Sequence, residues 1–217
     1  MRKLCSFMGM QCKCALTEDD LITLLSSFDP MDPDDLVFIS IVLSSFHALL
    51  HLSEITQPDS HLKHSFRKTT LHHSVKLTPN TFSFTLPTHQ ANCYFESSMI
   101  LIESHVGHLC PRQPFLQYLT ARDIRFPLHP LLWIHSTGKV PTYSWVMNKL
   151  KSTLGSDVVG HSLCSGGATA LAITGTPDDH IQAHGQWSSH TYHMYIHKHP
   201  VMLQSLLHGC SAFDIHL

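Results

Sequence analysis

The chain has 217 residues, of which 43% are apolar, enough for one large domain with a hydrophobic core. Its formal net charge is −2 and its isoelectric point is about 6.8, unlike the strongly basic balance typical of duplex-binding domains. No apolar run reaches the roughly 18 residues of a membrane-spanning helix, and no apolar segment follows the first basic residues, so we expect neither a membrane span nor a secretory signal.

The cysteines argue against a disulfide framework. There are seven, an odd number, with no Cys-x-x-Cys pair, which favours reduced thiols in an intracellular protein. Cys12 and Cys14 stand close together, but no second Cys/His pair follows at finger spacing, so we expect no metal there. Residues 1–14 show no periodicity and are interpreted as a lead-in to the domain.

Two helices are predicted at the start of the domain. Thr17 is a good N-cap, and the acidic residues that follow it suit the positive end of a helix dipole. The apolar face of this helix consists of Leu21, Ile22, Leu24, Leu25 and Phe28. A turn with two prolines leads into a second helix, roughly residues 36–50, which is apolar nearly all round and should therefore be buried.

Three β-like runs follow, at residues 71–77, 81–86 and 99–103. The second run alternates as a half-buried strand does, and a Thr-Pro-Asn turn at residues 78–80 separates it from the first. We therefore predict three antiparallel strands between about residues 70 and 104, with helices on either side.

The next part of the chain is predicted to be mainly helical. A short helix is expected at residues 110–119 and an extended segment with two prolines at residues 126–133. Pro141 is expected in the first turn of a further helix that reaches about residue 154 and carries Trp145, Val146 and Leu150 inward. Lys149 and Lys151 on this helix are candidates for contact with a DNA backbone, and solvated lysines are the alternative.

Three features stand at fixed spacings in the last third of the chain. A Gly-His pair ending at His161 opens a helix rich in small residues. A Gly-Gln-Trp-Ser-Ser element begins at Gly185, 24 residues after that histidine. Tyr195 follows Gln186 by nine residues, on a short helix closed by a proline.

This layout resembles the C-terminal half of tyrosine recombinases, the phage-integrase type of DNA breaking and rejoining enzymes. In that family a His-x-x-Arg box, a Gly-(His or Trp) box and a tyrosine nine residues later surround one DNA phosphate. The short segments Gly-His-Ser, Gly-Gly-Ala-Thr-Ala-Leu and Trp-Ser-Ser most resemble those of recombinases carried by fungal mobile elements. The resemblance implies an α+β, mainly helical catalytic domain with a small three-stranded antiparallel sheet, and double-stranded DNA as its partner.

When the family's catalytic positions are matched to this chain, two of the catalytic residues are retained, and the residues with a permanent positive charge are replaced. His161 opens the His box and Tyr195 is the nucleophile, but Cys164 replaces the arginine of the box. His51 occupies the position of the first catalytic arginine, with a structural histidine at a helix end as the alternative. Gln90 stands at or beside the family's hairpin lysine.

Three further residues complete the implied site. Gln186 stands where the family has His, Trp or another hydrogen-bond donor, and Glu54 is the acid that follows the first arginine position. Tyr192 is a rival nucleophile, but it follows Gln186 by six residues and not by nine. We expect His51, His161, Cys164, Gln186 and Tyr195 to converge on one shallow pocket.

The charge losses bear directly on the chemistry that the resemblance implies. In such an enzyme the tyrosine oxygen attacks the phosphate, and two arginines neutralise the charge on its oxygens. Removing one such arginine from a phosphoryl-transfer site costs on the order of 10³–10⁵ in rate. Histidine offers one donor toward a given oxygen, and cysteine only a weak S–H donor. We therefore predict a degenerate, catalytically inactive copy; the alternatives are a non-catalytic DNA-binding remnant and a structural relic of a mobile element.

The amino-acid composition suggests a cause for the replacement of the arginines. The chain has 20 histidines but only five arginines, the last of them Arg125. Arginine codons that begin with CG become His, Cys or Gln codons by single C-to-T changes on one strand or the other. We hypothesise mutational decay of a mobile-element gene, with a histidine-rich compositional bias as the alternative.

A metal site is the competing chemistry at the C-terminal end. His190, His193 and His197 fall on one helix face, and two of them could chelate zinc, but decayed arginines also explain the cluster. We expect no metal and no cofactor. We further expect residues 15–217 to form the catalytic domain without the helical core-binding domain that normally precedes it. Weakened DNA binding, self-association on DNA and a nuclear or other intracellular location complete the expectations.

Overall fold

A computed structural model describes residues 15–87, 97–105, 107 and 109–187 of the chain. The lead-in at residues 1–14, Gln90 and the stretch from residue 188 onward lie outside the described residues. The latter stretch contains Tyr192, Tyr195 and the histidines at positions 190, 193 and 197.

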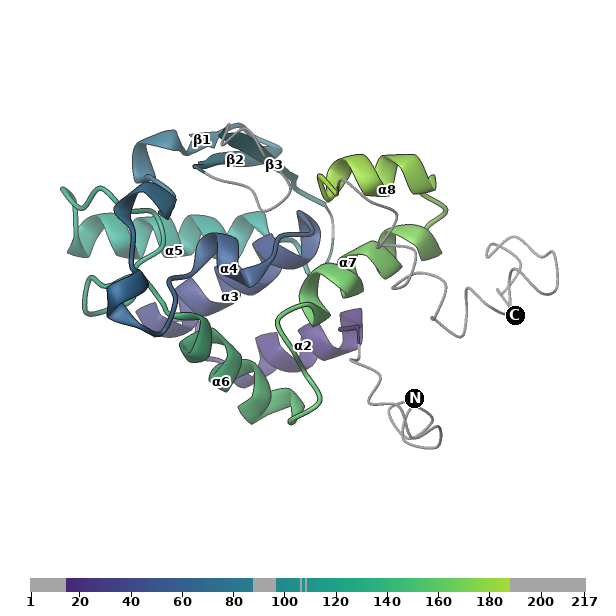
Figure 1. The fold of residues 1–217 in the computed structure, drawn as a ribbon, viewed down its shortest axis with the longest axis horizontal. Helices are drawn as coiled ribbons and strands as arrows, with labels where there is room; N and C mark the ends of the chain where they lie inside the picture. The colour runs from purple at the N-terminus through teal and green to yellow at the C-terminus, as the bar shows by residue number, and fades with distance from the viewer. Residues whose placement is uncertain (1–14, 88–96, 106, 108, 188–217) are drawn as a thin grey trace, which may run out of the picture.

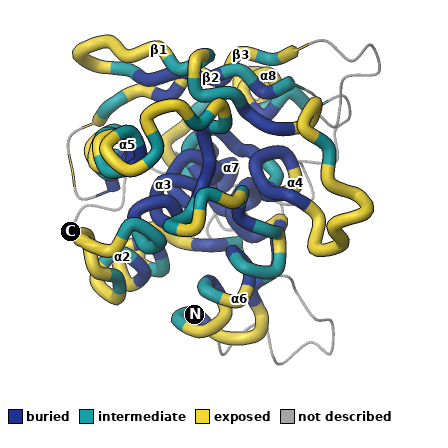
Figure 2. The backbone as a smooth tube through the Cα atoms, turned by 90° about the vertical axis from the view of Figure 1, so that its left-hand side faces the viewer, coloured by how far each residue is buried: buried dark blue, intermediate teal, exposed yellow. Residues whose placement is uncertain are grey.

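The two predicted N-terminal helices are present. Helix α2 (Glu18–Ser27) begins after Thr17, whose side chain accepts a hydrogen bond from the Asp20 N–H in a reciprocal capping box. Helix α3 (Pro33–His47) starts and ends about three residues earlier than predicted, and every residue from Leu36 to Phe46 is buried. Figure 2 shows α3 as a dark-blue rod in the centre of the molecule. The nearly all-apolar sequence of this helix is thus explained by its central position.

The chain turns sharply after α3. Leu49 adopts a left-handed backbone conformation (φ 55°), and its side chain is nevertheless buried. A single turn of helix, α4 (Leu52–Ile55), follows at once. Three short 3₁₀ turns then lead to the sheet: η2 (His61–Lys63), η3 (Phe66–Lys68) and η4 (His72–Ser74).

The predicted three-stranded antiparallel sheet is confirmed, in the order β1 (Lys76–Leu77), β2 (Thr81–Leu86), β3 (Ser98–Glu103). The first strand is much shorter than predicted. The prediction of strand over residues 71–75 was wrong because the backbone there bonds to a distant segment: the His72 N–H donates to the Pro130 carbonyl and the Leu132 N–H to the Thr70 carbonyl. These contacts replace the ladder that β1 would otherwise extend.

One face of the sheet packs on α5 (Arg112–Arg125), as Figure 1 shows. The Phe82 and Phe115 rings stack at 4.1 Å, and Phe84 meets Trp133 edge-on at 5.5 Å between ring centroids. Helix α5 extends six residues beyond its predicted end, to Arg125. The extension is stabilised by Arg122, which is buried and whose guanidinium donates to the carbonyls of the irregular segment that follows.

The remaining helices are α6 (Tyr143–Leu154), α7 (Ser162–Ile173) and α8 (Asp178–His184). Thr142 caps α6, so Pro141 precedes the helix instead of lying in its first turn as predicted. Val146 and Leu150 are fully buried, as predicted, and Trp145 packs against the core while remaining partly exposed. Helix α3 packs against both α5 and α7, and α2 packs against α6. No helix in the described part of the chain is both long and apolar enough to span a bilayer.

Candidate functional site

His51 is positioned by the start of α4. Its backbone N–H donates to the Glu54 Oε2 atom at 2.9 Å, and the Glu54 side chain is buried. The left-handed turn at Leu49 ends α3 and directs the chain so that His51 faces the first turn of α7. The local sequence therefore fixes where the His51 backbone lies, and the neighbouring helix determines what its ring meets.

His161 and Cys164 come from the first turn of α7. His161 is exposed, whereas Cys164 is fully buried and its thiol donates to the His161 carbonyl at 3.3 Å. The Cys164 sulfur lies 4.0 Å from His51 Nδ1, and the ring centroids of His51 and His161 are 5.0 Å apart at 72°. The structure thus brings together three of the residues that the sequence nominated.

Two glycines let α7 approach its neighbours closely enough for this contact. A Cβ atom on Gly167 would lie 2.0 Å from the Phe46 carbonyl oxygen on α3. A Cβ atom on Gly166 would lie 2.2 Å from the Leu16 carbonyl oxygen. Since backbone atoms cannot yield as a flexible side chain can, the small-residue character of α7 is required for its packing.

Gln186 lies directly after α8, with a left-handed backbone (φ 52°) and a half-exposed side chain. The next residue, Trp187, packs against a second apolar cluster formed by Leu49, Cys164, Ala168, Ala172 and Ile181. Gln186 is thereby placed one residue from a side chain that covers the cluster containing Cys164. The convergence of Gln186 with His51 and His161 on one pocket stays a prediction. The position of Tyr195 is also untested, because Tyr195 lies outside the described residues.

The electrostatics of this group differ from those of a phosphate-binding site with arginines. Burial raises the pKa of the Cys164 thiol to about 12, so the thiol is neutral at physiological pH. Among the described residues at this position, His51, His161, Cys164 and Gln186, none carries a permanent positive charge. The group can donate hydrogen bonds to a phosphate oxygen, but it has no planar bidentate donor.

The two nominated lysines of α6 have different surroundings. The Lys149 ammonium lies 2.5 Å from Asp35 Oδ1 and is half-buried, so its charge is already engaged within the protein. Lys151 is exposed in the last turn of the helix. Contact of either lysine with DNA remains a prediction.

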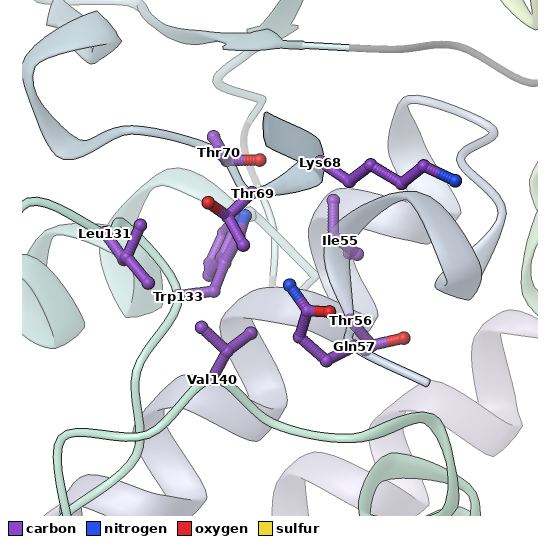
Figure 3. Close-up of a pocket in the computed structure, with 9 residues that line it drawn as sticks. All are labelled: Ile55, Thr56, Gln57, Lys68, Thr69, Thr70, Leu131, Trp133 and Val140. Atoms are coloured by element: carbon purple, nitrogen blue, oxygen red, sulfur yellow. The ribbon is translucent and has the colours of Figure 1, made fainter. Parts of the chain in front are cut away.

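Two cavities lie near α4 in the described part of the chain, and His51, His161 and Cys164 line neither of them. The smaller, about 10 Å³, lies between α4 and the Trp133 segment, and Figure 3 shows its lining residues. The larger, about 410 Å³, starts at Ser53, two residues from His51, and reaches Lys63 and Tyr143. The Tyr143 hydroxyl in turn packs against Gly160, next to His161. Sequence reasoning missed this cavity because residues 53–63, which form most of its wall, carry no motif, and Tyr143 joins them only through the fold.

No protein-family model matches the sequence, and no curated protein is found to match it. The chain is similar in structure to the XerH site-specific recombinase bound to a palindromic difH substrate in a post-cleavage complex, with a TM-score of 0.60 and 10% identity. That match covers 90% of this chain and 52% of the XerH chain. The pre-cleavage XerH–difH complex matches with a TM-score of 0.58 and 12% identity over 89% of this chain and 53% of the other.

The chain therefore spans about half the length of these XerH structures. At this level of identity the match establishes the fold, and the predicted fold class is confirmed by it and by the observed helices and sheet. The described part of the chain has the fold of a tyrosine-recombinase catalytic domain.

Proposed function

We propose that this protein is a DNA-binding domain of the tyrosine-recombinase type, derived from an enzyme of a mobile element that joins DNA through Tyr195, and that this copy is catalytically inactive. The observation that supports it most is the meeting of His51 and Cys164, 113 positions apart in sequence, beside His161. These are the positions at which the sequence resemblance places the family's two arginines and its histidine. Their proximity in a recombinase-like fold is unexpected for an unrelated helical domain.

The inactivity follows from the chemistry of the replacements. Attack of a tyrosine oxygen on a phosphodiester adds negative charge to the non-bridging oxygens, and this charge needs fixed donors nearby. Cys164 is a buried, neutral thiol, and the His51 ring offers a single donor in any one direction. Losses in a concerted site do not multiply cleanly, but replacement of both arginines removes the main stabilisation of the transition state.

The test uses a nicked suicide duplex and a denaturing gel that detects covalent protein–DNA adducts. We expect the unmodified 217-residue protein to shift a duplex at low salt but to form no adduct, and Tyr195→Phe to leave the shift unchanged. The variant His51→Arg/Gln90→Lys/Cys164→Arg should regain adduct formation, and adding Tyr195→Phe should abolish it. An adduct from the unmodified protein would refute inactivity. If the protein does not shift the duplex even at low salt, DNA binding is refuted, and the alternative of a structural relic without a function is favoured.

A further inference from the structure

A segment next to the site concentrates positive charge in a protein whose net charge is −2. No acidic residue occurs between Asp59 and Glu96. Within this stretch Lys63, Arg67 and Lys68 are all exposed, on the 3₁₀ turns η2 and η3. We call these three residues the basic ridge. The near-neutral charge of the whole chain therefore conceals a local basic surface.

The basic ridge is not engaged by the acidic residues that the structure describes. The ion pairs among those residues are His72–Asp123, Arg122–Asp123 and Lys149–Asp35, and none includes a ridge residue. Figure 3 shows the Lys68 side chain extended past Ile55 of α4, with its ammonium pointing away from the small cavity. The charges of the ridge are consequently available to an external anion.

Hydrogen bonds hold the ridge rigidly against the elements of the site. The Gln57 amide nitrogen donates to the Ser65 carbonyl at 3.3 Å, and the His64 ring donates to the Pro58 carbonyl at 2.8 Å. The backbone of Gln57 is itself paired with the segment that enters α6: its N–H donates to the Pro141 carbonyl at 3.0 Å, and its carbonyl accepts from the Tyr143 N–H at 2.9 Å. The backbone of the ridge is thus already ordered, so contact with a ligand orders mainly the lysine and arginine side chains.

The larger cavity lies between the ridge and the segment that follows His51. Its lining includes Ser53, two residues after His51, and Lys63 of the ridge. Asp59 also lines it, but that carboxylate accepts a hydrogen bond from the Ser144 N–H at 3.1 Å and caps the start of α6. The acidic group in this cavity is thus bonded to the start of α6, and Lys63 lies in the same hollow.

Two apolar side chains next to the ridge residues in sequence are highly exposed. Leu62 is 98% exposed and Phe66 is 62% exposed. A nucleic-acid backbone alternates anionic phosphates with less polar deoxyriboses, so it offers contacts both to the cations and to the exposed apolar side chains of this segment. This pattern favours a nucleic-acid backbone over a small anion.

We propose that the basic ridge is a contact surface of this protein for the sugar–phosphate backbone of duplex DNA, adjoining the His51–His161 site. The proposal rests on the proposed function, since it takes the duplex to lie over that site. The contact is independent of sequence, because exposed lysine and arginine side chains on phosphates carry no base information.

The test measures binding of the full chain to a fluorescein-labelled, random-sequence duplex of about 30 base pairs over a series of potassium chloride concentrations. The ridge variant is Lys63→Gln/Arg67→Gln. The matched control is Lys139→Gln/Arg125→Gln, which removes the same two charge types from exposed positions outside the segment. Each phosphate contact contributes about 0.9 to the slope of log K against log salt.

We expect the ridge variant to lower that slope by about 2 and to bind on the order of tenfold or more weakly at low salt, while the control keeps the wild-type slope. Wild-type binding with an unchanged slope in the ridge variant would overturn this inference and leave the proposed function standing. Equal losses in both variants would also overturn it, because they would show a response to net charge alone. A wild-type protein that does not bind the duplex would overturn the inference and the proposed function together.

Discussion

The ammonium of Lys149 on α6 lies 2.5 Å from the Asp35 carboxylate on α3. The same ammonium sits over three aromatic rings, with centroid distances of 5.3 Å to Phe28, 5.6 Å to Phe38 and 5.0 Å to Trp145. Both charged side chains are largely removed from water, at 25% and 14% exposure. The pair therefore joins α3 and α6 inside an aromatic cage, and its first role is in the fold.

We predict that Lys149→Met lowers the free energy of unfolding by about 1–3 kcal/mol, because it removes a partly buried charge from its partner and from the rings. Methionine keeps the length of the stem, so little packing is lost. Urea titration followed by tryptophan fluorescence measures the change. Lys151→Met on the exposed face of the same helix is the control and should change stability by less than about 0.5 kcal/mol. Equal effects of the two substitutions would show that the cage contributes nothing.

Gly167→Ala should destabilise the protein by more than about 3 kcal/mol, although alanine is the better helix former by about 1 kcal/mol. The added methyl group would lie 2.0 Å from the Phe46 carbonyl oxygen, and backbone must move to accommodate it. Thermal unfolding monitored by circular dichroism shows whether the substitution lowers or raises the stability. A stabilised Gly167→Ala variant would mean that α7 packs farther from α3 than the structure has it.

A histidine cluster predicts a loss of stability in mild acid. Burial, the neighbouring His105 and, more weakly, His184 lower the pKa of His47 to about 4 from 6.5, while its bond to the Leu109 carbonyl opposes the shift. The His184 ring also donates to the His47 carbonyl at 2.8 Å, which ties α8 to α3. Because the folded state resists protonation, this group stabilises the fold fully above about pH 6.5 and progressively less as the pH falls toward 4.

The expected cost of that protonation is on the order of 1–3 kcal/mol between pH 6.5 and 4. Because the chain has 20 histidines, the measurement compares the wild type with His47→Gln, which keeps a donor toward Leu109. The difference in unfolding free energy between the two proteins should shrink across this range and be constant above pH 7. His73→Gln, at an exposed position, should leave the wild-type pH profile unchanged. Parallel profiles for the wild type and His47→Gln would contradict the prediction.

The two described cysteines should differ strongly in reactivity. Cys164 is fully buried, and burial raises its pKa to about 12. At Cys110 burial acts in the same direction, but the Ser104 hydroxyl and backbone N–H groups at the start of α5, including that of Arg112, outweigh it and lower the thiol pKa. Iodoacetamide labelling at pH 7.5, read by peptide mass spectrometry, should modify Cys110 more than about 100-fold faster than Cys164. The two rates should converge in urea, and similar rates in the native protein would place Cys164 at an accessible position.

Several elements could be predicted from the sequence because their determinants are local. The capping box at Thr17 needs only residues within one turn, and the alternation over residues 81–86 specifies which strand face is apolar. The Gly-His pair likewise marked the start of α7. The resemblance to tyrosine recombinases, and not periodicity or spacing alone, nominated His51 and Cys164, which the fold brings together across 113 positions.

Other properties were decided only by contacts between distant segments. Residues 71–77 were predicted as a strand, but residues 70–72 form hydrogen bonds with residues 130–132 instead. Helix α5 continues to Arg125 because Arg122 donates to carbonyl oxygens beyond the helix end. The sequence indicated that Lys149 is a surface cation. In the structure it pairs with Asp35, 114 positions away, and its ammonium lies over aromatic rings. Hydrogen-bond caps and periodic apolar faces are encoded within a few residues, whereas burial and ion pairing depend on which segments the fold brings together. The sequence alone therefore nominated the residues of the candidate site, and the tertiary structure decided that Cys164 is buried and neutral beside His51.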